Sequence, residues 1–446
     1  MILVAAHVTR VTPAARLESI NRMNAARSNV QVEVNGRSYR APGRPVVVIC
    51  YDGCDPAYLA DAAIRGLTPA LSAMMAEGFY SSALSAMPSF TNPNNVSIVC
   101  GAPPRVHGVS GNYWFDRDTG KEVMMTDAGP LRAPTILARL AAAGVKVAAV
   151  TAKDKLRKVL AAGLAGPGLP GLAFSAERAD TCTVGEHGLD AAEALGPAKV
   201  PDQYSPELSL FVLDAGLRLL GQRGSELVYL SLSDFVQHAH APGAAASDDF
   251  IRAVDARMAA FLAAGAIVGV VADHGMTDLS LHDGSPNILY LGDLLDQRFG
   301  AGRFKVICPI TDPFVRHHGA LGGFVRVHVL DGSDPAPLRD FVAGLPGVHL
   351  ALTRDEACAR FDLPPEREGD VTVVAEKGVA LGTRQGEHRL DELAGARLRS
   401  HGSLAERPVP FVLSQPLNPD YRARARAAPL YNYDIFDFAL NGTETA

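Results

Sequence analysis

The 446-residue chain lacks several features that would assign it to particular classes of protein. Its longest apolar runs, such as 45–50, are far shorter than the ~20 residues that a membrane-spanning helix needs, so we expect no membrane partner. Lys and Arg (42) do not outnumber Asp and Glu (48), and the net charge of -6 argues against a nucleic-acid partner. No long low-complexity tract indicates disorder, so the chain is expected to fold.

Neither a secretion signal nor a cysteine-based metal site is evident. The apolar stretch 1–8 has no basic residue before it and no clear cleavage site after it, which predicts a cytoplasmic protein. Met23 is an alternative start, which would make 1–22 an upstream extension. The six cysteines form no zinc-knuckle pairs, and we expect them to be buried reduced thiols, even for Cys50 and Cys54 around a turn.

The apolar pattern predicts an α/β fold. Buried parallel strands are indicated by short, branched apolar runs at 46–50, 145–150, 227–232 and 266–272. Helical patterns alternate with them at 135–143, 205–220 and 248–264. This alternation is typical of a doubly wound sheet, and a length of 446 residues predicts a second module beside it.

Two regions depart from the alternation. The segment 160–201 is rich in Gly, Pro and Ala, which predicts a long irregular surface excursion. From about 319 to 381 the pattern predicts a compact α+β insertion, with strands at 323–329, 348–352 and 371–375 and helices at 336–344 and 354–361. After it we expect a strand at 410–413 and a helix at 435–440. We therefore predict an N-terminal extension and lead-in (1–44), an α/β core (45–300 and 385–446) and an inserted smaller cap domain (301–384).

Candidate metal ligands follow the predicted strands. Open α/β sheets bind ligands at the carboxyl ends of their strands, where three aspartates lie. One histidine follows an aspartate by four residues, another follows directly, and a third lies beside a glycine. A two-metal hydrolase needs ligands from several loops, because no single segment surrounds two ions ~3.5–4 Å apart. Although a lone Asp-His pair is more often an ordinary turn, the whole set predicts such a centre: Asp52, Asp234, His238, Asp273, His274 and His401.

Thr91 has two interpretations. It lies just before a predicted helix at 94–100, where a threonine followed by a proline is a common helix start that needs no chemistry. As a nucleophile, its hydroxyl would instead be ionised by a metal ion, beside helix N–H groups that favour a phosphoryl oxygen.

These motifs together resemble the alkaline phosphatase superfamily over roughly residues 45 to 420. The matching segments are Tyr51-Asp52-Gly53, Phe90-Thr91-Asn92-Pro93-Asn94-Asn95, Asp234-x-x-x-His238, Asp273-His274-Gly275-Met276 and His401-Gly402. Within it, three segments are more similar to the phosphonoacetate hydrolases than to the nucleotide pyrophosphatases and phosphodiesterases: 91–95, 111–114 and 152–157.

The resemblance implies a hydrolase with two Zn²⁺ per chain that cleaves the C–P bond of phosphonoacetate through a phosphothreonine intermediate. One zinc would be held by Asp52, Thr91, Asp273 and His274, and the other by Asp234, His238 and His401. Asn112 would contact a phosphonate oxygen, and Lys153 and Lys155 would bind the substrate carboxylate.

The charges of this set agree with a carboxylate-bearing substrate. Three aspartates and an ionised Thr91 balance the four charges of two Zn²⁺, so the carboxylate needs its own cations. The departing carbanion also has to spread its charge into that carboxylate. Both assignments have ordinary alternatives, because a basic run such as 153–158 is usually a solvated helix face and Asn after Gly is a common turn residue.

Other functions stay open. A nucleotide pyrophosphatase or phosphodiesterase would share the metal ligands and Thr91 but would want an aromatic slot, for which Phe90, Tyr113 and Trp114 are available. A catalytically silent metal-binding protein is disfavoured by the complete ligand set. A sulfatase is disfavoured by the spacing in 100–105. Three other places could also host a metal, although lone or adjacent histidines in loops are more often structural or solvated: Glu387-His388, His317-His318 and His240. A homodimer and a monomer are both compatible with the sequence.

Overall fold

The computed structural model describes residues 30–312, 318–393 and 396–444 and centres on one eight-stranded sheet, in the order β20-β4-β19-β10-β3-β9-β7-β8. Its strands are β3 (Val46–Cys50), β4 (Phe79–Leu84), β7 (Val147–Thr151), β8 (Leu172–Ser175), β9 (Leu227–Ser231), β10 (Ile267–Val271), β19 (Pro408–Leu413) and β20 (Leu430–Tyr431). The strands from β10 to β8 run parallel, whereas β19 is antiparallel to both of its neighbours. The predicted α/β class is therefore confirmed.

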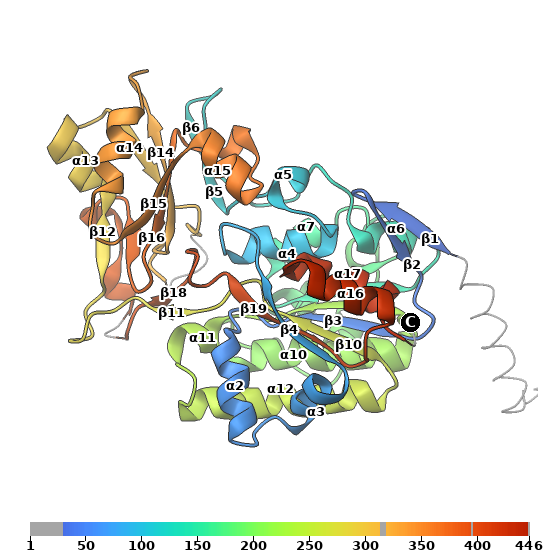
Figure 1. The fold of residues 1–446 in the computed structure, drawn as a ribbon. Coiled ribbons are helices and arrows are strands. Elements are labelled where there is room, and N and C mark those ends of the chain that lie inside the picture. Colours follow the sequence, from blue (N-terminus) through green and yellow to red (C-terminus); the bar gives the residue numbers. More distant parts are fainter. Residues whose placement is uncertain (1–29, 313–317, 394–395, 445–446) are drawn as a thin grey trace, which may run out of the picture.

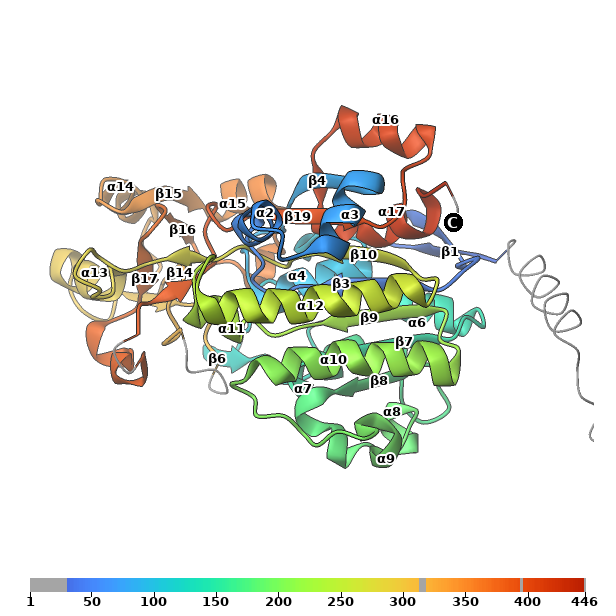
Figure 2. The same ribbon diagram turned by 90° about the horizontal axis from the view of Figure 1, so that it is seen from below.

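Two layers of helices cover the sheet (Figures 1 and 2). One face carries α4 (Thr91–Cys100), α6 (Ile136–Ala142), α7 (Asp154–Leu160) and α17 (Ile435–Asn441), and the other carries α3 (Pro69–Glu77), α10 (Pro206–Arg218) and α12 (Ala245–Ala263). Because both faces are covered, every residue of β3, β7, β9 and β10 is buried, which explains their uninterrupted apolar sequences. The predicted strands and helices of this core are confirmed to within a few residues.

The prediction of an irregular excursion at 160–201 is wrong in one respect. The segment contains β8, which pairs in parallel with β7 and forms one edge of the main sheet. It also contains the short helices η1 (Ala176–Thr181), α8 (Val184–His187) and α9 (Ala191–Leu195). A four-residue strand among glycines and prolines carries too little periodicity to be recognised, and its conformation depends on pairing with β7.

A second, four-stranded antiparallel sheet forms the cap at the left of Figure 1, in the order β13-β14-β16-β15. It consists of β13 (Phe304–Ile307), β14 (Phe324–Val329), β15 (Val348–Thr353) and β16 (Val371–Ala375), with α14 (Ala336–Ala343) and α15 (Arg354–Phe361). Its apolar side chains, such as Phe324 and Val342, form a cluster apart from the main core. The predicted elements of this region are present, and β13 is additional. The limits 300/301 and 384/385 stay a prediction.

The rest of the chain adds little to the site. Strands β1 (Gln31–Val34) and β2 (Arg37–Arg40) form a hairpin, while Met1, Met23 and His317 lie outside the described residues. All six cysteines are buried and unpaired, as expected. In the part of the chain that the structure describes, no helix is long and apolar enough to cross a bilayer.

Candidate metal centre and substrate pocket

Three buried aspartates meet at the carboxyl edge of the sheet. Asp52 follows β3, Asp234 follows β9 and Asp273 follows β10, with exposed fractions of 4%, 8% and 0%. Gly53, next to Asp52, has a φ of +68°, and a Cβ there would lie 3.2 Å from the Cβ of Asp234. The glycine therefore allows the first two strand ends to approach closely.

Three histidines are oriented alike around these carboxylates. Each places Nδ1 against a backbone carbonyl: His238 on Arg399 (2.5 Å), His274 on Gly275 (2.9 Å) and His401 on Ser89 (2.8 Å). An imidazole that donates Nδ1–H in this way presents the lone pair of Nε2, and metal-binding histidines are commonly held so.

The ligand atoms form two overlapping groups. Asp234, His238 and His401 make one, and Asp52, Asp234 and His274 make the other, with ligand atoms within 4.8 Å of one another in each group. The rings of His274 and His401 stack with centroids 3.4 Å apart. Asp234 belongs to both groups, so it lies between two positions that could each hold an ion.

The surroundings of Asp52 fit a cation. Its Oδ1 is buried and accepts no hydrogen bond from the described residues, and it lies 3.3 Å from His274 Nε2. Because His274 donates through Nδ1, this contact brings a carboxylate oxygen against a lone pair. A metal ion between these atoms would remove the repulsion.

Burial and like charges shift the pKa values of the cluster. Burial, followed by the charges of Asp234 and Asp273, raises the pKa of Asp52 well above its usual range, and burial also raises that of Asp273. Burial, followed by His274 and His238, lowers the pKa of His401. The histidine is thus held neutral, in its metal-binding form, while the ionised aspartates need a nearby positive charge.

Thr91 is the first residue of α4 but does not cap it. The N-cap residue is Phe90, without a side-chain hydrogen bond to the helix, so the interpretation of Thr91 as an N-cap is wrong. Its Oγ1 lies 3.1 Å from His274 Nε2 instead. The hydroxyl therefore faces the candidate metal ligands.

The asparagines after Thr91 hold it in place. Asn94 donates to the carbonyls of Ala86, Pro88 and Phe90, which fixes the loop before the helix. Asn95 donates both to the carbonyl of Thr91 (3.0 Å) and to Asp273 (3.1 Å), and it accepts a hydrogen bond from Tyr229 (2.7 Å).

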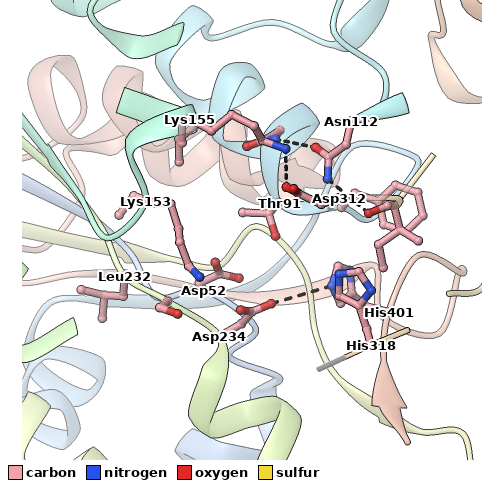
Figure 3. A pocket seen from close by; sticks show the side chains of 16 residues that line it. Asp52, Thr91, Asn112, Lys153, Lys155, Leu232, Asp234, Asp312, His318 and His401 are labelled. Atoms are coloured by element: carbon pink, nitrogen blue, oxygen red, sulfur yellow. Dashed lines mark hydrogen bonds and ion pairs between the residues drawn. The ribbon is translucent and has the colours of Figure 1, made fainter. Parts of the chain in front are cut away.

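Asn112 and both lysines reach the same pocket (Figure 3). Its cavity volume is about 70 Å³, and Lys153 and Lys155 also line a second cavity of about 580 Å³. Asn112 accepts from Asn92 and donates to the carbonyl of Ile310 (3.3 Å). The structure thus brings all ten predicted site residues together, although His238, Asp273 and His274 lie behind the pocket wall.

Two polar pocket residues from the segment after β13 were not predicted. Asp312 forms an ion pair with Lys155. His318, considered an ordinary histidine, is buried with its ring centroid 5.8 Å from that of His238. No local motif marks either residue, since their proximity to the metal ligands depends on the docking of the cap.

Of the three aromatic residues considered for a nucleotide slot, Phe90 alone lines the pocket. Phe90 is buried and packs edge-on against His401. Tyr113 is hydrogen-bonded to Glu122, and the Trp114 ring lies 4.2 Å below the Arg367 guanidinium. Neither Tyr113 nor Trp114 lines the pocket, so these three residues do not form a base-stacking slot.

Comparison with known proteins agrees with this geometry. Residues 46–403 match the model of the family described as type I phosphodiesterase / nucleotide pyrophosphatase. Two crystal structures of phosphonoacetate hydrolase from Sinorhizobium meliloti 1021, in complex with phosphonoformate and with phosphonoacetate, are 43% identical in sequence. Each match covers 92% of this chain and 98% of the other, with a TM-score of 0.86.

More distant matches concern the fold or a short segment. Murine ectonucleotide pyrophosphatase / phosphodiesterase 5 is 15% identical over 90% of this chain and 96% of its own, with a TM-score of 0.60. An uncharacterized pyrophosphatase/phosphodiesterase of Schizosaccharomyces pombe is 38% identical over 78 residues, 17% of this chain and 15% of that protein. The chain therefore belongs to the type I phosphodiesterase / nucleotide pyrophosphatase family and is a homologue of phosphonoacetate hydrolase.

Proposed function

We propose that the protein is a cytoplasmic, two-zinc phosphonoacetate hydrolase that converts phosphonoacetate and water into acetate and phosphate. The observation that carries this proposal is the shared pocket, which is lined by Thr91, Asp52, Asp234 and two lysines (Figure 3). The 43% identity to a phosphonoacetate hydrolase over nearly its whole length supports the same substrate.

The metal ligands are assigned as two sets. Asp52, Thr91, Asp273 and His274 would hold one Zn²⁺, and Asp234, His238 and His401 would hold the other. When bound, zinc lowers the pKa of coordinated hydroxyl groups and neutralises charge on phosphoryl oxygens. The unshared Oδ1 of Asp52 and the matching orientation of the three histidines favour this assignment.

The positions of the side chains support the following course of reaction. Thr91 Oγ1 loses its proton to solvent and attacks phosphorus, and as the C–P bond breaks its electron pair passes to the methylene carbon and spreads into the carboxylate. Lys153 and Lys155 stabilise that charge, and a proton from water completes acetate. Asn112 would orient a phosphonate oxygen. Water then hydrolyses the phosphothreonine, which releases phosphate and restores Thr91.

Two alternatives remain testable. A nucleotide pyrophosphatase or phosphodiesterase would use the same metals and Thr91, and the family description favours it. Against it, Tyr113 and Trp114 lie outside the pocket that contains Thr91. A catalytically silent metal-binding protein would bind zinc without turnover.

The test is phosphate release from phosphonoacetate by the zinc-loaded protein, set beside hydrolysis of a nucleotide-type phosphodiester. Thr91→Ala should abolish turnover while keeping the fold. Lys153→Ala/Lys155→Ala should selectively lower kcat/KM for phosphonoacetate by about 100-fold or more, because removal of one group that stabilises transition-state charge has an effect of this order. Lys158→Ala is the matched control, because Lys158 lies on the same helix but pairs with Asp154 (3.6 Å) and does not line the pocket.

The outcomes separate the alternatives. Preferred turnover of phosphonoacetate that depends on both lysines supports the proposal. Preference for the diester, without dependence on the lysines, supports the phosphodiesterase. Two equivalents of bound zinc with no turnover of either compound supports the silent protein.

A further inference from the structure

The two lysines of the pocket have different surroundings. Lys153 precedes α7 and its ammonium points toward Asp52, with Nζ 5.5 Å from the centre of the Tyr204 ring (Figure 3). Lys155, in the first turn of α7, forms an ion pair with Asp312. The side chains of Lys155 and Asp312 are only 14% and 8% exposed, so this pair is largely withdrawn from water.

Asp312 is held firmly at this position. It follows β13 in a turn in which Thr311 N donates to the carbonyl of Cys308 (3.0 Å). The backbone N–H of Asn112 donates to the carbonyl of Pro309 (2.8 Å), and its side chain donates to Ile310. The segment that carries Asp312 is thus attached to the loop that presents Asn112 to the pocket.

Positive charges outnumber negative charges on the side of the pocket that is formed by Lys153, Lys155 and Asp312. Apart from Asp52 and Asp234, the charged described residues that line it are Lys153, Lys155 and Asp312. The two lysines and the aspartate together carry a net charge of +1, which a single carboxylate would balance.

We propose that Asp312 is a specificity-determining residue, which matches the leaving-group side of the pocket to a monoanionic carboxylate and disfavours a dianionic phosphate there. This inference rests on the proposed function. If a carboxylate reaches Lys153 and Lys155, the charges of the three side chains and of this carboxylate sum to zero. A second phosphate would add an unbalanced negative charge beside Asp312 in a partly buried site, where charge interactions are stronger than in water.

The experiment compares two ligands that differ at this end. Phosphonoformate carries a carboxylate and methylenediphosphonate carries a second phosphonate, and binding of each to the zinc-loaded protein is measured by calorimetry at a fixed free zinc concentration. Asp312→Asn keeps the shape and removes the charge. We expect the preference for phosphonoformate to fall about tenfold, chiefly through tighter binding of methylenediphosphonate.

Two further variants serve as controls. Asp312→Glu keeps the charge and should keep the wild-type preference. Asp180→Asn makes the same charge change at an exposed aspartate outside the pocket and should alter neither affinity. An unchanged preference in Asp312→Asn, with both ligands weakened equally, would show that Asp312 only positions Lys155 and would overturn the inference.

Failure of the proposed function is read separately. Absence of phosphonoacetate turnover by the wild-type protein would refute that function, whereas the ratio of the two affinities reports on Asp312 without any turnover. If Asp312→Asn does not fold, loss of the wild-type preference in Asp312→Glu would overturn the inference, and its retention would support a role for the charge.

Discussion

Replacing Asp52 by asparagine should have opposite effects with and without zinc. In the metal-free protein the change removes one charge from a cluster of buried carboxylates. The ligand atoms of Asp52 and Asp234 lie within 4.8 Å, where two unit charges repel by about 3–4 kcal/mol at an effective dielectric constant of 20. The raised pKa of Asp52 means that proton uptake already relieves part of this repulsion. We therefore expect Asp52→Asn to stabilise the metal-free protein by about 1–3 kcal/mol at pH 7.5.

With zinc bound, Asp52→Asn should instead destabilise the protein. Loss of a carboxylate ligand should weaken zinc binding by at least about 100-fold, which removes about 2.7 kcal/mol of metal-induced stability. The assay is urea unfolding of chelator-treated and zinc-loaded protein, with Asp180→Asn as an exposed control. If metal-free Asp52→Asn is less stable than metal-free wild type, the repulsion argument is refuted. If zinc stabilises both proteins equally, Asp52 is not a ligand.

Three further substitutions test residues that support the site from outside the pocket. Arg326→Met should destabilise the protein by about 3–5 kcal/mol in urea unfolding, because it leaves the fully buried Glu368 without its ion-pair partner. The double variant Arg326→Met/Glu368→Leu should recover most of this stability. A double variant as unstable as the single one would contradict the prediction. Burial lowers the pKa of His107 to about 3, below its unfolded value, so its contribution to stability is present above pH 6.5 and is lost as the pH falls towards 3. His107→Gln should flatten the decline in unfolding free energy between pH 6.5 and 4, and an unchanged slope would argue against a neutral buried imidazole. Gly402→Ala should weaken zinc binding in a competitive chelator titration, because its Cβ would lie 2.4 Å from Phe90; unaltered affinity would show that the loop adapts.

The sequence predicted the metal-ligand cluster because each aspartate follows an apolar strand. Parallel strands bring their carboxyl ends to one edge, so Asp52, Asp234 and Asp273 had to meet once the strands were recognised. The helical spacing of Asp234 and His238 likewise predicted their shared direction, and they are in contact at 2.9 Å.

Other parts of the molecule could not be predicted from local patterns. Strand β8 is defined by its neighbour in the sheet and not by its own four residues. Asp312 and His318 reach the pocket only through the way the cap docks on the core, which no spacing along the chain reveals. For Lys153 and Lys155, the same basic sequence suits a solvated helix face and a pocket wall, and the fold places both lysines at the pocket.

The position of His401 in the chain has a consequence for biosynthesis. The histidine lies beyond the whole cap, in the segment between β18 (Arg399–Ser400) and β19 that leads back to the main sheet. On the ribosome, Asp52, Asp234 and His238 emerge long before it, and the group that it completes cannot form until the whole cap has been translated. A nascent chain that stalls within the cap therefore holds only part of this candidate ion-binding group, and the cap has to be translated before the group can assemble.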